Sequence, residues 1–195
     1  MGKKLSQMSN HELWKLFPII LKEYNSEWLN WYVDEEKLLY EAIGKENIER
    51  TNHIGSTAVD GLLAKPTIDI LLEIINDFDV DKLISILEEN GYICMAKQNR
   101  NPLNITLVKG YTEKGFANRV FHIHVRYFGD WNELYFRDYL RVNKDVTTQY
   151  RNLKLSLKEK CEHDRDAYSN AKSEFILKHT DIARDILNDK YNPEK

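Results

Sequence analysis

The sequence predicts an α+β fold: a small mixed β-sheet flanked by helices, followed by C-terminal helices. Apolar strand-like runs fill the middle of the chain, helical patterns stand before and between them, and residues 145–190 show helical patterns alone. A length of 195 residues suits one domain. We therefore expect a single domain over residues 1–195, with an α/β core at about residues 13–144 and C-terminal helices at residues 145–190.

Each element of the core has its own signal. A helix in the second half of residues 13–44 should end near Gly44, because glycine commonly follows the last helical turn. A second, amphipathic helix is expected at residues 79–91, with an aspartate near its start and Gly91 at its end. Runs rich in apolar and β-branched residues predict the strands at residues 47–55, 65–74, 92–97, 103–110 and 118–128.

The helical part should begin at residues 129–143, where Asp130 and Glu133 resemble a capping box. Between residues 145 and 190 we expect two helices that separate around residues 162–169. Residues 1–12 are expected to form a mobile arm.

The composition indicates an ordered protein without a general affinity for polyanions. Apolar residues make up 42% and charged residues 30% of the chain. The net charge of −3 gives no basic field, so nucleic acid is not expected as a partner. Cys94 and Cys161 have no metal-ligand spacing, and reduced thiols without a secretory signal point to the cytoplasm. No run approaches the roughly 18 apolar residues of a membrane helix, so no membrane partner is expected.

The stretch HIGSTAVDGLLAKPTIDILLEI, residues 53–74, holds the first candidate site residues. In the turn Gly55-Ser56-Thr57, glycine allows close backbone approach, and the hydroxyl and N–H groups could hold phosphate oxygens. The same residues could equally cap a helix without any ligand. Lys65 could contact a phosphate or lie on the surface.

An aspartate inside an apolar strand needs a partner, because burying an unpaired carboxylate is costly. Alternation puts Asp69 on the strand face opposite the core residues, and we expect Glu73, on the same face, to be a solvated strand end. In FHIHVRY, alternation likewise groups His122, His124 and Arg126. The two histidines could bind a divalent cation or face Asp69, or this face could simply be solvent-exposed.

Arg137 and Arg141 are four residues apart on a predicted helix and therefore share a face. They could bind an anion, although a solvated charged face is the commoner arrangement. Farther along, aromatic and basic residues alternate, which helix packing with snorkelling lysines explains: Tyr150, Lys154, Tyr168, Lys172 and Phe175.

Together, HIGST followed by KPTIDI, FHIHVRY and FRDYLR resemble the GrpB family (UPF0157), small bacterial proteins of the nucleotidyltransferase superfamily, over about residues 17–180. Asp60 departs from the family's usual proline, which should loosen the turn. The resemblance implies that Gly55 and Ser56 seat phosphates and that Asp69 is one strand carboxylate. The superfamily's second carboxylate would fall at Thr67 or Leu71, so the pair is incomplete.

The resemblance implies metal-dependent transfer of a nucleotidyl group from a nucleoside triphosphate to a hydroxyl of an unknown small-molecule acceptor. Asp69 and His124 would be catalytic, and Asp69, His122 and His124 would hold the metal, Mg²⁺ or Mn²⁺ first and Zn²⁺ as a possibility. Phosphates would be bound by Gly55, Ser56, Thr57, Lys65, Arg137 and Arg141. The alternatives are a non-catalytic nucleotide- or phosphate-binding protein and a metal-dependent phosphohydrolase that uses the histidines. The acceptor, the preferred nucleotide and the oligomeric state stay open.

Overall fold

The computed structural model describes residues 3–98, 102–188 and 190–193, and it confirms the α+β class. Five strands form one mixed sheet in the order β1-β2-β5-β4-β3. β2 and β5 run parallel, and the other neighbouring strands run antiparallel. The strands are β1 (Ile48–Ile54), β2 (Ile68–Ile74), β3 (Ile93–Gln98), β4 (Asn104–Thr112) and β5 (Gly115–Tyr127).

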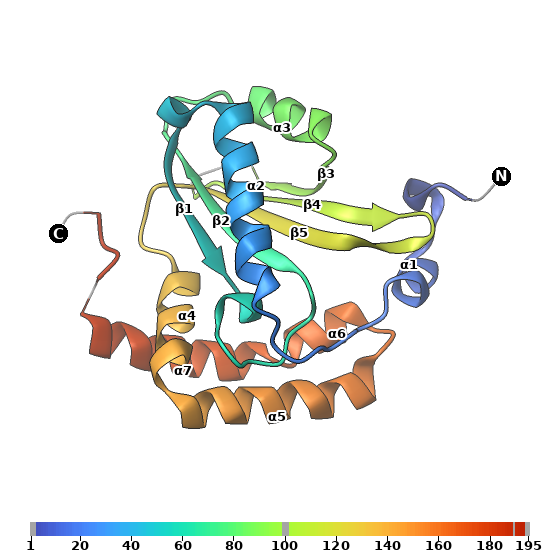
Figure 1. The fold of residues 1–195 in the computed structure, drawn as a ribbon, viewed down its shortest axis with the longest axis vertical. Coiled ribbons are helices and arrows are strands. Elements are labelled where there is room, and N and C mark those ends of the chain that lie inside the picture. Colours follow the sequence, from blue (N-terminus) through green and yellow to red (C-terminus); the bar gives the residue numbers. More distant parts are fainter. Residues whose placement is uncertain (1–2, 99–101, 189, 194–195) are drawn as a thin grey trace.

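Helices lie on both faces of this sheet (Figure 1). The N-terminal part contributes α1 (Asn10–Leu16), α2 (Glu27–Ile43) and α3 (Val80–Glu89), and the C-terminal part contributes α4 (Asn132–Val142), α5 (Lys144–Cys161), α6 (Arg165–Asn170) and α7 (Ser173–Leu187). Short 3₁₀ turns are η1 (Leu5–Gln7), η2 (Lys45–Asn47) and η3 (Ser56–Ala58).

The main core lies between the sheet and the helices α2 and α3. Alternate residues of β2, namely Ile68, Ile70 and Leu72, point into this core, as the strand period requires. The helices contribute Trp28 from α2 and Leu83 from α3. The opposite face of β2 and β5, which carries the polar residues, is therefore left for the C-terminal helices, which run below it in Figure 1.

Three expectations about the helices need correction. Asp130 does not cap α4; its carboxylate instead pairs with Arg184 of α7 at 2.6 Å, and Trp131 occupies the N-cap position. The chain between residues 145 and 190 forms three helices rather than two, because Asp164 caps the additional short helix α6 by accepting a hydrogen bond from Ala167 N–H. Within the expected arm, Ser9 begins α1 with a capping box.

Glu73 is also not the solvated strand end that its position suggested. Its side chain is 0% exposed. Arg50 donates to it from Nε at 2.5 Å and from Nη2 at 2.8 Å, and Gly129 N–H donates at 3.0 Å. The antiparallel register pairs Arg50 with Glu73 and so brings the two guanidinium donors to the carboxylate.

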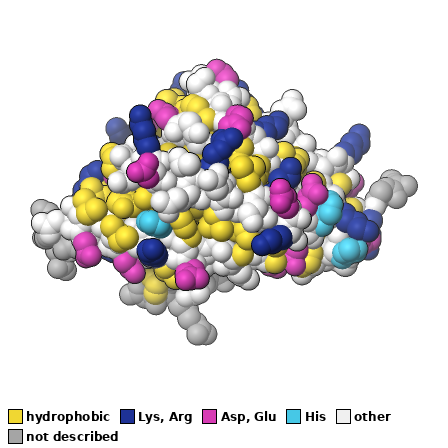
Figure 2. Space-filling view, turned by 90° about the horizontal axis from the view of Figure 1, so that it is seen from below, with side chains coloured by type: hydrophobic (Ala, Val, Ile, Leu, Met, Phe, Trp, Pro, Cys, Tyr) yellow, Lys and Arg dark blue, Asp and Glu magenta, His cyan; other side chains and the backbone are white. Residues whose placement is uncertain are grey.

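The face formed by the C-terminal helices carries side chains of both charges among apolar patches (Figure 2). Basic and acidic groups alternate there, so this face, as far as it is described, offers no continuous basic stripe of the kind that binds nucleic acid.

Within the described ranges, no helix combines the length and apolar character that spanning a bilayer requires.

Candidate active site

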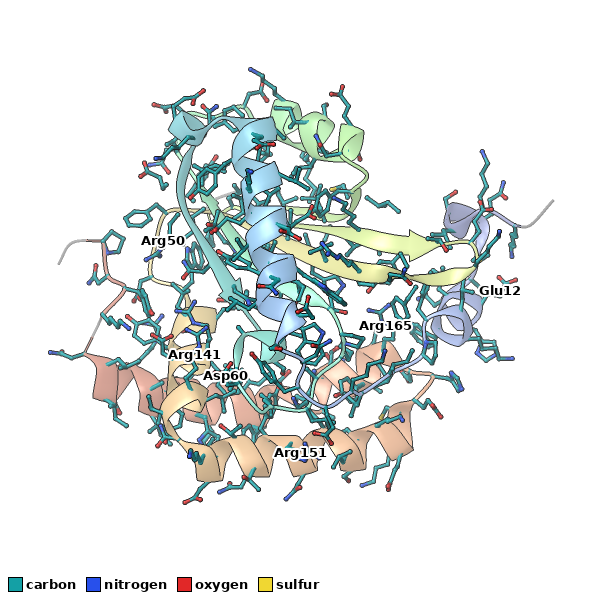
Figure 3. All side chains as sticks on the ribbon, in the orientation of Figure 1. Glu12, Arg50, Asp60, Arg141, Arg151 and Arg165 are labelled. Carbon is teal, nitrogen blue, oxygen red and sulfur yellow. The ribbon has the colours of Figure 1, made fainter. Side chains whose placement is uncertain are left out.

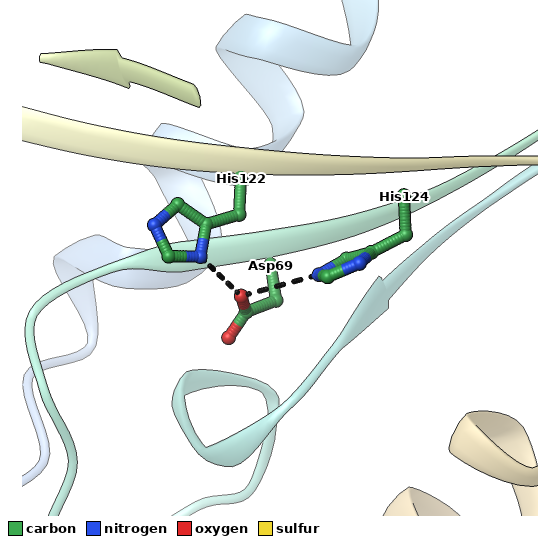
Figure 4. A group of neighbouring side chains, drawn as sticks. All are labelled: Asp69, His122 and His124. Carbon is green, nitrogen blue, oxygen red and sulfur yellow. Dashed lines mark ion pairs between the residues drawn. The ribbon is translucent and has the colours of Figure 1, made fainter. Parts of the chain in front are cut away.

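Asp69, His122 and His124 meet on the polar face of the sheet (Figure 4). The parallel register places Asp69 beside His122, and His124 follows two residues later on the same side of β5. Asp69 Oδ1 lies 3.2 Å from His122 Nδ1 and 3.6 Å from His124 Nε2. The sequence left open whether these two strands are neighbours, and the structure pairs them.

The three side chains suit a divalent cation. One potential ligand atom from each, a carboxylate oxygen or an imidazole nitrogen, lies within 4.8 Å of the others. Burial alone would raise the pKa of Asp69, but hydrogen bonds from the two neighbouring histidines hold this pKa below its usual range, so the carboxylate is ionised. Burial lowers the pKa of His122, which favours the neutral imidazole that can act as a ligand. One carboxylate and two imidazoles are a donor set that Mn²⁺ and Zn²⁺ accept readily.

Gly55 is required by the position of Asp69. Its φ of 71° with ψ of −171° is a conformation that only glycine adopts readily. A Cβ atom there would lie 2.4 Å from Asp69 Oδ2. The glycine turn thus lets the backbone pass directly against the carboxylate.

The two hydroxyls that follow Gly55 have different surroundings. Thr57 is buried: its hydroxyl donates to Thr67 O at 3.0 Å and contacts His53 Nε2 at 3.0 Å. Ser56 instead accepts a hydrogen bond from Lys154 Nζ at 3.1 Å. Both residues line the cavity beside the turn, but the Thr57 hydroxyl is bonded within the turn region, whereas the Ser56 hydroxyl bonds to Lys154.

A cavity of about 200 Å³ opens between this turn and the C-terminal helices. Three lysines line it: Lys65 from the loop before β2, Lys154 from α5 and Lys172 just before α7. Asp69 and His122 line the same cavity. Three cations and one carboxylate give this cavity a net positive lining, which suits a phosphate-rich ligand.

Two features of this cavity would be satisfied by a bound anion. Tyr168 lines it and is 1% exposed, yet its hydroxyl has no hydrogen-bond partner among the described residues. Burial and then the charge of neighbouring lysines lower the pKa of Lys154 and of Lys172 to about 7. An anion would supply the Tyr168 hydroxyl with an acceptor and relieve the repulsion between the lysines.

A larger cavity of about 670 Å³ adjoins the first and shares Gly55, Ser56, Asp69 and Tyr150 with it. His124 opens into this second cavity, whereas His122 lines the smaller one. Aromatic and polar side chains make up its remaining walls, including Trp131, Phe136 and Asn104. The Asp–His–His cluster thus lies at the boundary of two cavities.

The two arginines predicted to bind phosphate are not among the described residues that line the two cavities. Arg137 is buried and donates to Asn52 Oδ1, His53 O and Tyr191. Arg141, in the last turn of α4, donates to Ala58 O and lies near Asp60 (Figure 3). Their surroundings lend no support to the phosphate role, which stays a prediction.

Sequence reasoning missed Lys154, Lys172 and Tyr168 as site residues. A signal was present, because Tyr150 and Lys154, and again Tyr168 and Lys172, are spaced i,i+4. In the structure each lysine lies over the paired ring, at 4.7 Å and 4.3 Å from its centroid. Snorkelling lysines would have reached solvent, whereas Lys154 is only 2% exposed.

The fold and the site define a small α+β protein with an Asp–His–His cluster beside a lysine-lined cavity. The family model described as GrpB protein matches residues 18–181. The glutamate-rich protein GrpB of Alkalihalophilus pseudofirmus is 35% identical over 161 residues, which cover 81% of this chain and 91% of the relative. The chain therefore belongs to the GrpB family (UPF0157).

Solved structures agree with this membership. The conserved protein GrpB from Enterococcus faecalis superposes with a TM-score of 0.74 at 32% identity, covering 86% of this chain and 98% of that one. A weaker similarity, with a TM-score of 0.48 at 12% identity over 83% of this chain and 51% of the other, is to the poly(U) polymerase Cid1. At this TM-score and identity, the similarity carries no argument about this chain.

Proposed function

We propose that this protein transfers a nucleotidyl group from a nucleoside triphosphate to a hydroxyl of a small-molecule acceptor. The observation that carries the proposal is the contact between two parts of the site. Asp69 and His122, two members of a cluster able to hold a divalent cation, line the same cavity as three lysines, and the third member, His124, lines the adjoining cavity. Nucleotidyl transfer needs both: neutralised phosphates and an aligned acceptor oxygen.

The smaller cavity is the proposed site of the phosphates. Gly55 lets the chain approach them closely, and the cations of Lys65, Lys154 and Lys172 offset their charge. The acceptor would enter the larger cavity, which shares Asp69 with the smaller one. Its oxygen bonds to the α-phosphorus, the bond from that phosphorus to the bridging oxygen breaks, and pyrophosphate leaves. The acceptor proton passes to water in the open cavity.

Asp69, His122 and His124 are the residues proposed to hold the cation, with Asp69 and His124 closest to the acceptor. When bound, a divalent cation would neutralise developing charge on the phosphate oxygens. The family resemblance implies Mg²⁺, whereas two imidazole donors shift the preference toward Mn²⁺ or Zn²⁺. The cytoplasm remains the proposed location.

A second candidate, a nucleotide- or phosphate-binding protein without transferase activity, is favoured by the missing carboxylate. Thr67 is buried, with its carbonyl accepting from Thr57, and Leu71 is fully buried. Neither position offers a second acidic ligand next to Asp69. A site with one carboxylate could keep phosphate binding after losing transfer.

Pyrophosphate release distinguishes these functions. Purified protein is mixed with each nucleoside triphosphate, a panel of hydroxylated acceptors and Mg²⁺, Mn²⁺ or Zn²⁺. Asp69→Asn should lower release by about 100-fold or more, since it removes the only carboxylate in the cluster, whereas Asp34→Asn, on the exposed surface of α2, should not. Metal-independent nucleotide binding without release would establish the second candidate, and orthophosphate in place of pyrophosphate would indicate a phosphohydrolase.

A further inference from the structure

His122 has a second protein partner, on the side of the ring away from Asp69. Its Nε2 lies 2.8 Å from the hydroxyl of Tyr111, a residue of β4. The two rings are stacked with centroids 5.9 Å apart. Asp69 is at Nδ1 of the same ring, so both nitrogens of His122 have a defined neighbour.

Tyr111 is in turn held by a cation from the C-terminal helices. Arg165, the first residue of α6, donates from Nη2 to the Tyr111 hydroxyl at 2.8 Å. Its guanidinium also lies 5.2 Å from the centroid of the Tyr111 ring. Figure 3 shows Arg165 between α6 and the sheet. The hydroxyl therefore joins α6 to the histidine on β5.

Aromatic packing fixes the remaining freedom of Tyr111. Phe17 meets its ring edge-on at 4.8 Å between centroids, and Phe116 does so at 5.3 Å. A side chain held by two rings and an arginine has little rotational freedom, so its hydroxyl is a fixed point for His122.

The partner of the second ring nitrogen matters for a metal-binding histidine. An imidazole that ligates through one nitrogen carries its proton on the other, and the hydrogen bond made by that N–H sets the tautomer and the ring orientation. The Tyr111 oxygen can accept such a bond while it also accepts one from Arg165.

We propose that Tyr111 is a positioning residue: when a divalent cation replaces the proton between His122 Nδ1 and Asp69, the Tyr111 hydroxyl, oriented by Arg165, accepts the hydrogen bond from Nε2–H and holds Nδ1 toward the cation. This inference rests on the metal role of His122 in the proposed function. It assigns Tyr111 and Arg165, which do not line the acceptor cavity, to the metal-binding machinery.

The test compares wild-type protein with Tyr111→Phe, which keeps the ring and removes the hydroxyl. Affinity for Mn²⁺ and Zn²⁺ is measured by calorimetry, without substrate, and should fall about 10- to 100-fold. Arg165→Met should lower it by a smaller factor. Tyr139→Phe, a buried tyrosine on α4 that stacks on His179, serves as the matched control and should bind metal like the wild type.

Nitrogen-15 spectra of the histidine rings provide a second readout that needs no metal affinity. His122 should populate one tautomer in the zinc-loaded wild type, protonated on Nε2, and its ring signals should shift in Tyr111→Phe even without metal. Unchanged His122 signals, or an unchanged affinity in Tyr111→Phe, would overturn the inference. If the wild type binds no metal, the metal assignment of the proposed function fails. A comparison of the His122 ring signals between metal-free wild type and metal-free Tyr111→Phe then shows whether the Tyr111 hydroxyl positions the ring.

Discussion

Asp69 and Glu73 lie four residues apart on the same strand and the same face, yet their surroundings are opposite. Glu73 receives two hydrogen bonds from Arg50 and one from the Gly129 backbone, and it is sealed from solvent. Asp69 contacts two histidines, keeps 27% of its side chain exposed and borders two cavities. One carboxylate has all its partners in the chain, and the other has room for a ligand.

The difference shows what distinguishes a structural acid from a candidate ligand on a strand. An arginine fork and a backbone N–H satisfy a carboxylate permanently, because these donors do not lose their protons at physiological pH. Imidazoles are neutral or charged depending on conditions and are themselves metal ligands. The partners of a buried acid therefore indicate its role better than its burial does.

The largest effect is expected where the structural acid loses its partner. Arg50→Ala leaves the buried carboxylate of Glu73 without its fork and should lower the free energy of unfolding by about 3–5 kcal/mol. Urea denaturation measures this. Asp69→Asn should change the same quantity by about 1 kcal/mol or less, since its site is partly open. Arg119→Ala, which breaks the exposed pair with Asp34, is the control and should cost about 1 kcal/mol at most. Equal losses of stability in Arg50→Ala and Asp69→Asn would remove the distinction between the two acids.

The next effect concerns the backbone around Asp69. Gly55→Ala forces an unfavourable φ and places a methyl group against the Asp69 carboxylate, so we expect about 1–3 kcal/mol of destabilisation. Metal affinity should fall as well, because the carboxylate must move. Gly61→Ala has a comparable φ of 73° but nothing within 4 Å of the added Cβ, so it should cost stability without loss of metal binding. A Gly55→Ala variant with wild-type metal affinity would contradict this role of the turn.

Local patterns were sufficient to predict much of the fold and part of the site. Alternation located the strands and put Asp69 on the polar face of one strand and the histidines on the polar face of another, but it left open whether the two strands are neighbours. The burial of Glu73 and its pairing with Arg50 were not predictable in this way, because they depend on the register that places Arg50 opposite Glu73. A register depends on the whole sheet and cannot be read from one strand.

The lysines of the smaller, lysine-lined cavity were missed for a related reason. Lys154 reaches Ser56 across 98 positions of the chain, and its i,i+4 spacing from Tyr150 does not by itself separate a cavity lysine from a surface lysine. Only the packing of α5 and the segment before α7 against the Gly55 turn separates the two cases. Contacts between distant elements, rather than composition or spacing, build this half of the site.

A pH series tests whether these lysines act together. Because the pKa of Lys154 and of Lys172 is lowered to about 7, both lose charge as the pH rises from about 6 to 9. Affinity for inorganic tripolyphosphate, measured by calorimetry, should therefore fall by about 10-fold or more over that range. The free energy of unfolding should move the other way. The unfolded lysines keep their protons up to their usual pKa of about 10.4, so the unfolded state binds more protons and stability rises with pH. An affinity that is flat with pH would show that the lysines do not hold the anion.

The smallest effect is expected from the arginine that the structure places away from the cavity. Lys172→Met and Arg141→Met each remove one cation from the C-terminal part, so general electrostatics would make them nearly equivalent. Lys172 lines the smaller, lysine-lined cavity, whereas Arg141 has a side chain that is 45% exposed and donates to Ala58 O. Tripolyphosphate affinity should fall about 10-fold in Lys172→Met, as for the loss of one close charge pair, and about 2-fold or less in Arg141→Met. Equal losses would restore Arg141 as a phosphate ligand and would extend the anion site from the lysine cavity toward α4.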